Sequence, residues 1–255
     1  MGDVDRSPIV TGGLCRMLEE RVRRDGSRPL VTWYDLDGGA RVELSARTFA
    51  NWVDKTANLM ASIGVDDRPM VGMPLLVTDP GHWVGLVWAM AAWQIGGEVQ
   101  ADRREALDAV DLAVVGPTNT HPVPGVETVA CSLHPLGLGF PTPQRAVIDY
   151  AEVTGQPDAH WSATADDETP AFRGGTTIRT AGDVDHVPGT PHRIALRVSA
   201  GDDPWALLET ALVAPILGGG SIVLLVGGTD DAVARVLSTE GADQVVARAQ
   251  GPAPS

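Results

Sequence analysis

The sequence concentrates its potential metal ligands in one stretch, which holds Asp183, Asp185, His186 and His192. Carboxylate and imidazole groups are the ligands that zinc and other divalent cations take from proteins. The spacing here is irregular, and the surrounding residues show no hydrophobic period. We therefore interpret the four side chains as solvated loop residues and predict no metal site, with weak divalent-cation binding as the alternative.

The residues that could act as nucleophiles lack a catalytic context. Ser221 follows Gly220, but the second glycine of a G-x-S-x-G elbow is missing. Cys15 and Cys131 have no C-x-x-C spacing, which is typical of a reduced protein and not of a zinc or redox site. His82 stands at the expected start of a helix, and no serine or cysteine in a nucleophile motif is available for it to activate. We predict no hydrolase chemistry and assign no catalytic residue.

Charge and composition exclude several classes of partner. The 255 residues are 44% hydrophobic and 20% charged, and the formal net charge is -14. Because such a surface repels phosphate backbones and anionic head groups, we expect no nucleic-acid partner and no membrane partner. The first residues, Met1 to Arg6, show no basic segment leading into an apolar stretch, so we expect no export signal and a cytoplasmic location.

Alternating helix and strand patterns must position these side chains. Helical apolar spacing predicts helices over 14–24, 46–63, 83–95, 106–110, 144–153, 205–217 and 230–238. Short β-rich runs predict strands over 30–34, 40–44, 70–77, 98–101, 112–115, 126–131, 193–199, 221–226 and 243–247. A succession of strand, helix and strand implies parallel pairing, so the fold class is α/β, with mostly parallel, layered sheets and flanking helices.

Three blocks of the sequence occur in a recognisable order. They run from Arg28 through Glu43–Phe49 to Val65, from Val71 to Glu98, and from Pro204 to Leu224. Together they resemble the opening of the AMP-forming acyl- and aryl-CoA synthetases, the adenylate-forming enzyme superfamily, over about two thirds of the chain. The chain resembles a truncated, degenerate N-terminal part of such enzymes, of the kind found in a small uncharacterised bacterial family.

The resemblance implies a place where a nucleotide would bind. Members of this superfamily activate carboxylic acids with ATP, and they hold its phosphates with a Thr/Ser/Gly-rich loop that ends in lysine. Ile178 stands where that loop has a glycine, and Ala181 stands where it has the lysine. The sole lysine of the chain, Lys55, falls within a predicted helix and cannot replace it. Four residues match the core of the loop and are our candidate cofactor-binding residues: Gly174, Gly175, Thr176 and Thr177.

The resemblance also suggests a division of the chain. Residues 1–153 correspond to a first α/β lobe, and 193–250 form a second βαβα portion of the same domain. Between them, 154–192 is a Gly/Pro/Thr-rich linker or a degenerate phosphate loop, and 251–255 is a frayed tail.

Departures from the superfamily pattern decide our functional expectation. The aromatic-Gly-x-Thr-Glu motif, the ribose-binding aspartate with its arginine hinge, and the C-terminal lid with its lysine have no match here. Loss of one preorganised charge donor costs about 10²–10³ in rate. We expect a catalytically degenerate protein that binds a small molecule or has a regulatory role and is not an enzyme. We expect no cofactor, with ATP or AMP as the alternative.

Two other functions stay open. A truncated enzyme fold would uncover apolar surface, which favours a protein–protein scaffold, a partner subunit or a homodimer. A divergent nucleotide-dependent ligase could instead use Arg173 or Arg179 in place of lysine, although the arginine fork does not replace an ammonium group at a tight phosphate site.

Overall fold

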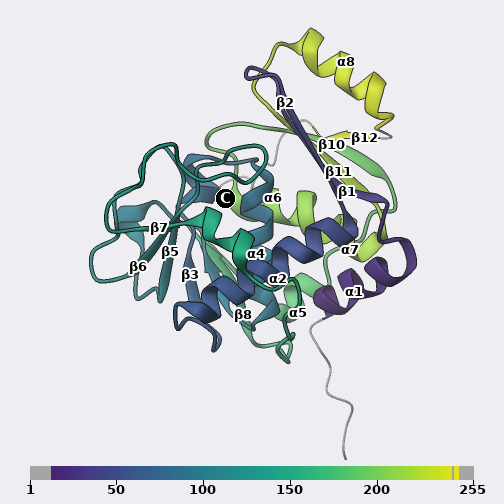
Figure 1. The fold of residues 1–255 in the computed structure, drawn as a ribbon. Coiled ribbons are helices and arrows are strands. Elements are labelled where there is room, and N and C mark those ends of the chain that lie inside the picture. Colours follow the sequence, from purple (N-terminus) through teal and green to yellow (C-terminus); the bar gives the residue numbers. More distant parts are fainter. Residues whose placement is uncertain (1–12, 243, 247–255) are drawn as a thin grey trace, which may run out of the picture.

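The computed structural model describes residues 13–242 and 244–246, which fold into two β-sheets with helices between and around them (Figure 1). Within these residues, no helix combines the length and apolar character needed to cross a membrane. The predicted fold class, α/β with mostly parallel, layered sheets, is confirmed.

The smaller sheet joins the two ends of the described chain. Its strand order is β12-β10-β11-β1-β2, with bounds β1 Pro29–Asp35, β2 Ala40–Ser45, β10 Arg193–Val198, β11 Ser221–Val226 and β12 Gln244–Val246. Val31 of β1 lies opposite Ile222 of β11 in a parallel pair, whereas β1 and β2 form an antiparallel hairpin. The first strands of the sequence therefore share a sheet with the last ones.

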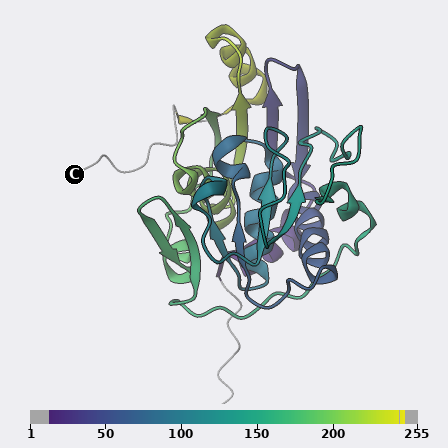
Figure 2. The ribbon, with the colours of Figure 1, turned by 90° about the vertical axis from the view of Figure 1, so that its left-hand side faces the viewer.

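The larger sheet has seven strands in the order β7-β6-β5-β3-β4-β8-β9. All neighbouring pairs are parallel except β8 with β9, which form a hairpin at one edge (green in Figure 2). The strand bounds are β3 Met70–Gly72, β4 Glu98–Gln100, β5 Leu112–Val115, β6 Glu127–Ala130, β7 Ile148–Asp149, β8 Pro170–Gly174 and β9 Thr177–Thr180.

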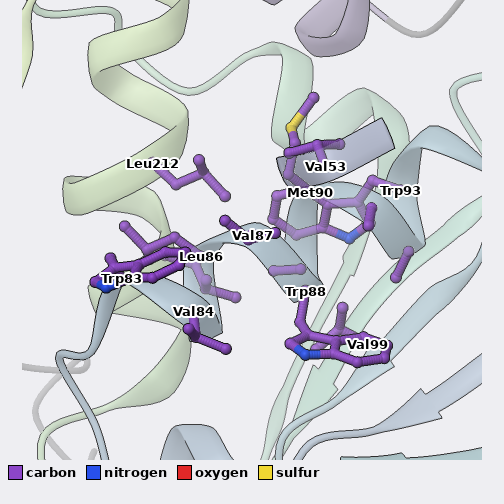
Figure 3. Close-up of a cluster of buried hydrophobic side chains, with 14 of the residues drawn as sticks. Val53, Trp83, Val84, Leu86, Val87, Trp88, Met90, Trp93, Val99 and Leu212 are labelled. Carbon is purple, nitrogen blue, oxygen red and sulfur yellow. The ribbon is translucent and has the colours of Figure 1, made fainter. Parts of the chain in front are cut away.

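The helices between the sheets carry the core. They are α1 Gly13–Asp25, α2 Ala46–Ser62, α4 Trp83–Gln94 and the run of α6 Pro204–Leu208, a π-helical turn Glu209–Val213 and α7 Ala214–Gly218. Every residue of α4 is buried, because its apolar side chains point all round the axis and meet neighbours on each side. Figure 3 shows Trp88 of α4 beside Val99 of β4, while Met90 lies beside Val53 of α2.

Helix α8, Asp230–Glu240, covers the outer face of the smaller sheet (Figure 1). A second apolar cluster forms there from Ala195, Val223 and Leu225 on the strands and from Val233 and Val236 on the helix.

Several predicted elements are wrong in detail. The long loop expected over 154–192 contains β8, β9 and the short helix α5 Ala181–Asp185. These elements have four or five residues each, which is too short to show a hydrophobic period. The helix expected over 144–153 is instead β7 followed by a 3₁₀ segment, Tyr150–Gly155, because the Asp149 carboxylate accepts the amide hydrogen of Ala151 and starts that segment.

Two further predicted boundaries are corrected. The strand expected over 70–77 ends at Gly72, and the four-residue helix α3, Leu75–Thr78, follows Pro74, which fixes a helical φ. The helix expected over 106–110 is a single 3₁₀ turn at Arg104–Ala106.

Candidate functional site

The four residues that match the phosphate-loop core form the tip of the β8–β9 hairpin. Gly174 pairs with Thr177 across the two strands, so Gly175 and Thr176 alone make the turn. Gly175 has φ +56, and a glycine with positive φ at the first turn position is typical of a type II′ hairpin. The segment is thus a tight two-residue turn and not a long loop.

Carboxylates already occupy two hydrogen-bond donors at this turn, the Gly175 amide and the Arg173 guanidinium. The amide nitrogen of Gly175 donates to Oδ1 of Asp102 at 3.0 Å. Beside it, Arg173 donates from Nε and Nη2 to the two carboxylate oxygens of Glu98, at 2.7 and 3.1 Å. This hydrogen-bonded carboxylate raises the pKa of the Arg173 guanidinium. A phosphate group would have to displace two internal anions to reach these donors.

The residues that flank the turn have other contacts. Ile178, which replaces a loop glycine, is 68% exposed. The guanidinium of Arg179 lies 5.4 Å from the ring centre of Trp205, in a cation–π arrangement. Lys55 donates from Nζ to the backbone carbonyls of Thr154 and Gln156, which ties α2 to the end of the 3₁₀ segment Tyr150–Gly155. These contacts give Arg179 and Lys55 a structural role.

Two of the four potential metal ligands, Asp183 and Asp185, are used in helix capping. Asp185 accepts hydrogen bonds from the first two backbone amides of α1, at 2.7 and 2.8 Å. Asp183 completes the capping box of α5, and Nδ1 of His186 lies 2.6 Å from a carbonyl oxygen of the same helix. Within residues 13–242 and 244–246, no group of three or more His, Cys, Asp or Glu side chains is arranged to hold a metal ion.

A pocket of about 310 Å³ opens between α1, α2 and α4, and we call it the α1–α2–α4 pocket. Leu18, Val53 and Met90 give it apolar walls. Asp54 and His160 stand among its polar lining residues, together with Gln94 and Cys15. An apolar cavity with a few convergent polar groups is the common form of a small-molecule site.

Gln94 is the most deeply buried polar side chain of this pocket, at 6% exposed. Its Nε2 donates to Oδ1 of Asp54 at 2.8 Å. Its Oε1 is shielded from solvent and accepts no hydrogen bond from any described residue. Buried polar atoms are almost always paired, so this oxygen requires an explanation.

His160 presents a second unpaired acceptor. Nδ1 of His160 lies 2.9 Å from Oδ1 of Asn58. The amide nitrogen of Asn58 donates to the carbonyls of Pro157 and Ala159, so Oδ1 must accept and the imidazole Nδ1 must donate. Burial lowers the pKa of His160, which keeps the ring neutral and leaves a lone pair on Nε2. Nε2 is shielded from solvent and has no partner in the described part of the chain.

The remaining titratable groups of the pocket differ in reactivity. Burial raises the pKa of the Asp54 carboxyl, and hydrogen bonds from the Gln94 side chain and the His160 backbone oppose this shift. Burial raises the pKa of the Cys15 thiol to about 12, so the thiol stays protonated and is a poor nucleophile. The titratable groups that line the pocket therefore include no activated nucleophile.

Sequence reasoning missed this site. Helical apolar spacing places Gln94 and Asp54 in predicted helices but indicates no role for them. No sequence pattern marks His160. One signal was present, because Gln94 carries the single amide in an otherwise apolar helix, Trp83–Gln94. A polar group at such a position is buried and needs a partner.

A second crevice, of about 250 Å³, lies at the carboxyl ends of β3 and β5, where the strand order reverses. Ligands of open α/β sheets often bind at such a point. Here, however, Asp79 accepts hydrogen bonds from Thr78 and Thr118, and Arg104 donates to two backbone carbonyls. These polar groups are paired within the chain, in contrast to those of the α1–α2–α4 pocket.

The comparison with solved structures decides the fold. The crystal structure of an acyl-CoA synthetase from Brucella canis superposes with a TM-score of 0.72 at 17% sequence identity, over 94% of this chain and 48% of that one. The chain has the fold of the N-terminal part of an acyl-CoA synthetase. The chain thus spans about half the length of the enzymes that share this fold.

Two aryl-CoA ligases show the same similarity. The anthranilate CoA ligase AuaEII, solved in complex with anthranoyl-AMP, has a TM-score of 0.61 at 15% identity, over 93% of this chain and 49% of that one. A benzoate CoA ligase from Burkholderia xenovorans has a TM-score of 0.65 at 12% identity, over 89% and 48%. At these identities the likeness concerns the fold alone.

The sequence comparisons are less extensive. A "TIGR03089 family protein" of Mycobacterium tuberculosis is 33% identical over 150 residues, covering 53% of this chain and 56% of that relative. No family model matches the sequence.

Proposed function

We propose that this chain is a small-molecule-binding or regulatory protein that retains an acyl-CoA synthetase scaffold and does not form adenylates. The observation that carries this proposal is the state of the β8–β9 turn, where Asp102 and Glu98 hold the amide and the guanidinium that a phosphate would need. An anion bound beside two carboxylates is repelled, and the turn contributes only two residues with which to enclose it.

The charge balance near the turn supports the same conclusion. Arg173 is neutralised by Glu98, and Ala181 stands where the superfamily pattern has its lysine. Phosphoryl groups require several preorganised positive charges or amides. The α1–α2–α4 pocket, with its apolar walls and few polar lining residues, is the place where we expect a small molecule to bind instead.

Nucleotide binding and adenylation can be tested separately. Isothermal titration of the purified chain with ATP and with AMP should show no saturable heat up to millimolar nucleotide. Carboxylate-dependent exchange of pyrophosphate into ATP, measured with acetate, benzoate and anthranilate, should stay at the level of a no-protein blank. Saturable nucleotide binding that Arg173→Ala abolishes would favour the divergent ligase, and exchange above the blank would overturn the proposal outright.

A further inference from the structure

We propose that two copies of this chain form a two-fold dimer in which Trp161 of each copy enters the α1–α2–α4 pocket of the other. This inference goes beyond the proposed function and starts from one exposed side chain. Trp161 is 58% exposed, and within residues 13–242 and 244–246 no other Phe, Tyr or Trp side chain is exposed. Exposed tryptophans are uncommon on a solvated surface and are enriched where proteins meet.

The chain holds Trp161 at the edge of its own pocket. His160 and Ser162, on either side of it, both line the pocket. The Trp161 ring stacks on the ring of His160, with 5.4 Å between the ring centres and 27° between the planes. The backbone is fixed as well, because the amide of Ala163 donates to the carbonyl of Gln94 at 2.7 Å. The exposed indole and the pocket therefore share one face of the molecule, which is the arrangement that a reciprocal two-fold contact requires.

The pocket has the size and the lining that one indole needs. Its volume of about 310 Å³ is at the small end for ligand sites, which suits a single two-ring side chain. Leu18, Val22 and Ala50 line it, and Val22 and Ala50 keep part of their surface in contact with solvent. The indole N–H of Trp161 makes no hydrogen bond to a described residue. The carboxylate of Glu19, which lines the pocket and is 51% exposed, is available to accept one.

The charges at the pocket are self-complementary. Glu19 and Arg23 lie one turn apart on α1, both line the pocket, and their side chains are 51% and 65% exposed. A two-fold axis between them brings Glu19 of one copy to Arg23 of the second copy, and symmetry forms the reverse pair. Within one copy their charged atoms are 3.9 Å apart at the surface, so little is lost when each turns to the second copy.

The test measures the oligomeric state of the full chain by sedimentation velocity, from about 5 µM to about 500 µM protein. Salt at about 0.3 M screens the repulsion between two copies that each carry a formal charge of -14. We expect a reversible equilibrium of monomer and dimer with a dissociation constant of about 10–100 µM, as for a small interface with one main anchor. Millimolar indole, added as a free probe of the pocket, should shift this equilibrium to the monomer.

Matched variants locate the contact. Trp161→Ala should weaken the dimer at least about thirtyfold, which is the loss when a central interface tryptophan is truncated. Ala50→Phe places a ring in the pocket from α2 and should weaken the dimer to a similar degree. Leu138→Ala is the control, because Leu138 is 55% exposed and does not line the pocket, so this variant should dimerise like the wild type.

Charge exchange tests the two-fold arrangement. Glu19→Arg and Arg23→Glu each place like charges at both contacts, so each variant alone should weaken its own dimer about threefold to tenfold. An equimolar mixture of the two should form a mixed dimer, because both contacts then join an arginine to a glutamate.

Each result bears on the inference. A monomer over the whole concentration range, a dimer that Trp161→Ala or free indole leaves unchanged, or two charge variants that do not associate when mixed would overturn it. These failures leave the absence of adenylation standing, since that is measured by nucleotide titration and pyrophosphate exchange. Conversely, nucleotide binding would overturn the proposed function without changing the sedimentation of the chain alone.

Discussion

Replacing Arg173 with alanine distinguishes a structural role of the hairpin from a nucleotide-binding one. In the wild type, the Arg173 guanidinium holds both carboxylate oxygens of Glu98, which is 6% exposed. No other described residue makes a side-chain hydrogen bond to that carboxylate. The variant therefore leaves a nearly buried negative charge without its partner, and the protein should lose stability whether or not a nucleotide is present.

The size of this loss follows from the exposure of the two partners. Breaking a fully buried ion pair costs about 3–5 kcal/mol, whereas exposed pairs contribute about 0–1 kcal/mol. The Arg173 side chain is 42% exposed, so solvent screens part of the interaction. We expect Arg173→Ala to lower the free energy of unfolding by about 1–3 kcal/mol. Glu98→Gln in the same chain should recover part of it, with a coupling of about 1 kcal/mol in the double-mutant cycle.

Urea unfolding followed by tryptophan fluorescence measures all four proteins of the cycle. Arg179→Ala is the matched control, because that arginine lies over the ring of Trp205 and should cost less than about 1 kcal/mol. Strict additivity of the Glu98 and Arg173 substitutions would refute our account of the hairpin. Our account would also be refuted if the wild type bound a nucleotide and Arg173→Ala lost that affinity while keeping the stability of the wild type.

Three further predictions concern the remainder of the molecule. Arg21→Met should lower the free energy of unfolding by about 2–4 kcal/mol in urea, because this buried arginine donates to three backbone carbonyls that would lose their partner. Burial raises the pKa of Glu240, but hydrogen bonds from one tyrosine and two arginines lower it by more. The net effect is a pKa below the ordinary 4.5. Its contribution is therefore present above pH 4.5 and lost as the pH falls below that value, so thermal melts of Glu240→Gln should depend less on acid pH than those of the wild type. Burial raises the pKa of Cys15 to about 12 and raises the pKa of Cys131 as well. A thiol reagent at neutral pH should therefore label neither cysteine until urea unfolds the chain. Rapid labelling of the native protein would contradict the burial of the two thiols.

The sequence predicts the long elements well and the short ones poorly. Helix α2 begins at Ala46, where the predicted helix begins, and the Ser45 hydroxyl caps it by accepting the amide hydrogen of Thr48 at 3.1 Å. Seventeen residues of helix give several turns of apolar period. The β8–β9 hairpin gives none, because its strands lie at a sheet edge and bury only Ala171 and Phe172. Such strands are fixed by pairing with distant β4, which no local pattern contains.

The candidate site shows the same limit in a sharper form. The motif at Gly174–Thr177 could be found from residue types, yet the carboxylates of Glu98 and Asp102 that occupy its donors come from another part of the chain. Gln94 could be noticed as the amide of an apolar helix, but its pairing with Asp54 depends on how α2 and α4 pack. Chemistry that depends on one segment is visible in the sequence, whereas chemistry that depends on two segments requires the fold.

The two sites follow from one property of buried hydrogen-bonding groups, which is that each must find a partner inside the chain or outside it. At the β8–β9 turn, the Gly175 amide and the Arg173 guanidinium found internal carboxylates, so a phosphate that approached them would compete with Asp102 and Glu98. In the α1–α2–α4 pocket, Gln94 and His160 likewise spend hydrogens on Asp54 and Asn58, and the atoms they leave unpaired are shielded from solvent. A buried acceptor without a partner costs about 1–3 kcal/mol, and this cost falls on the stability of the fold. A motif that survives in the sequence therefore provides a phosphate site only where its donors have no partner inside the chain.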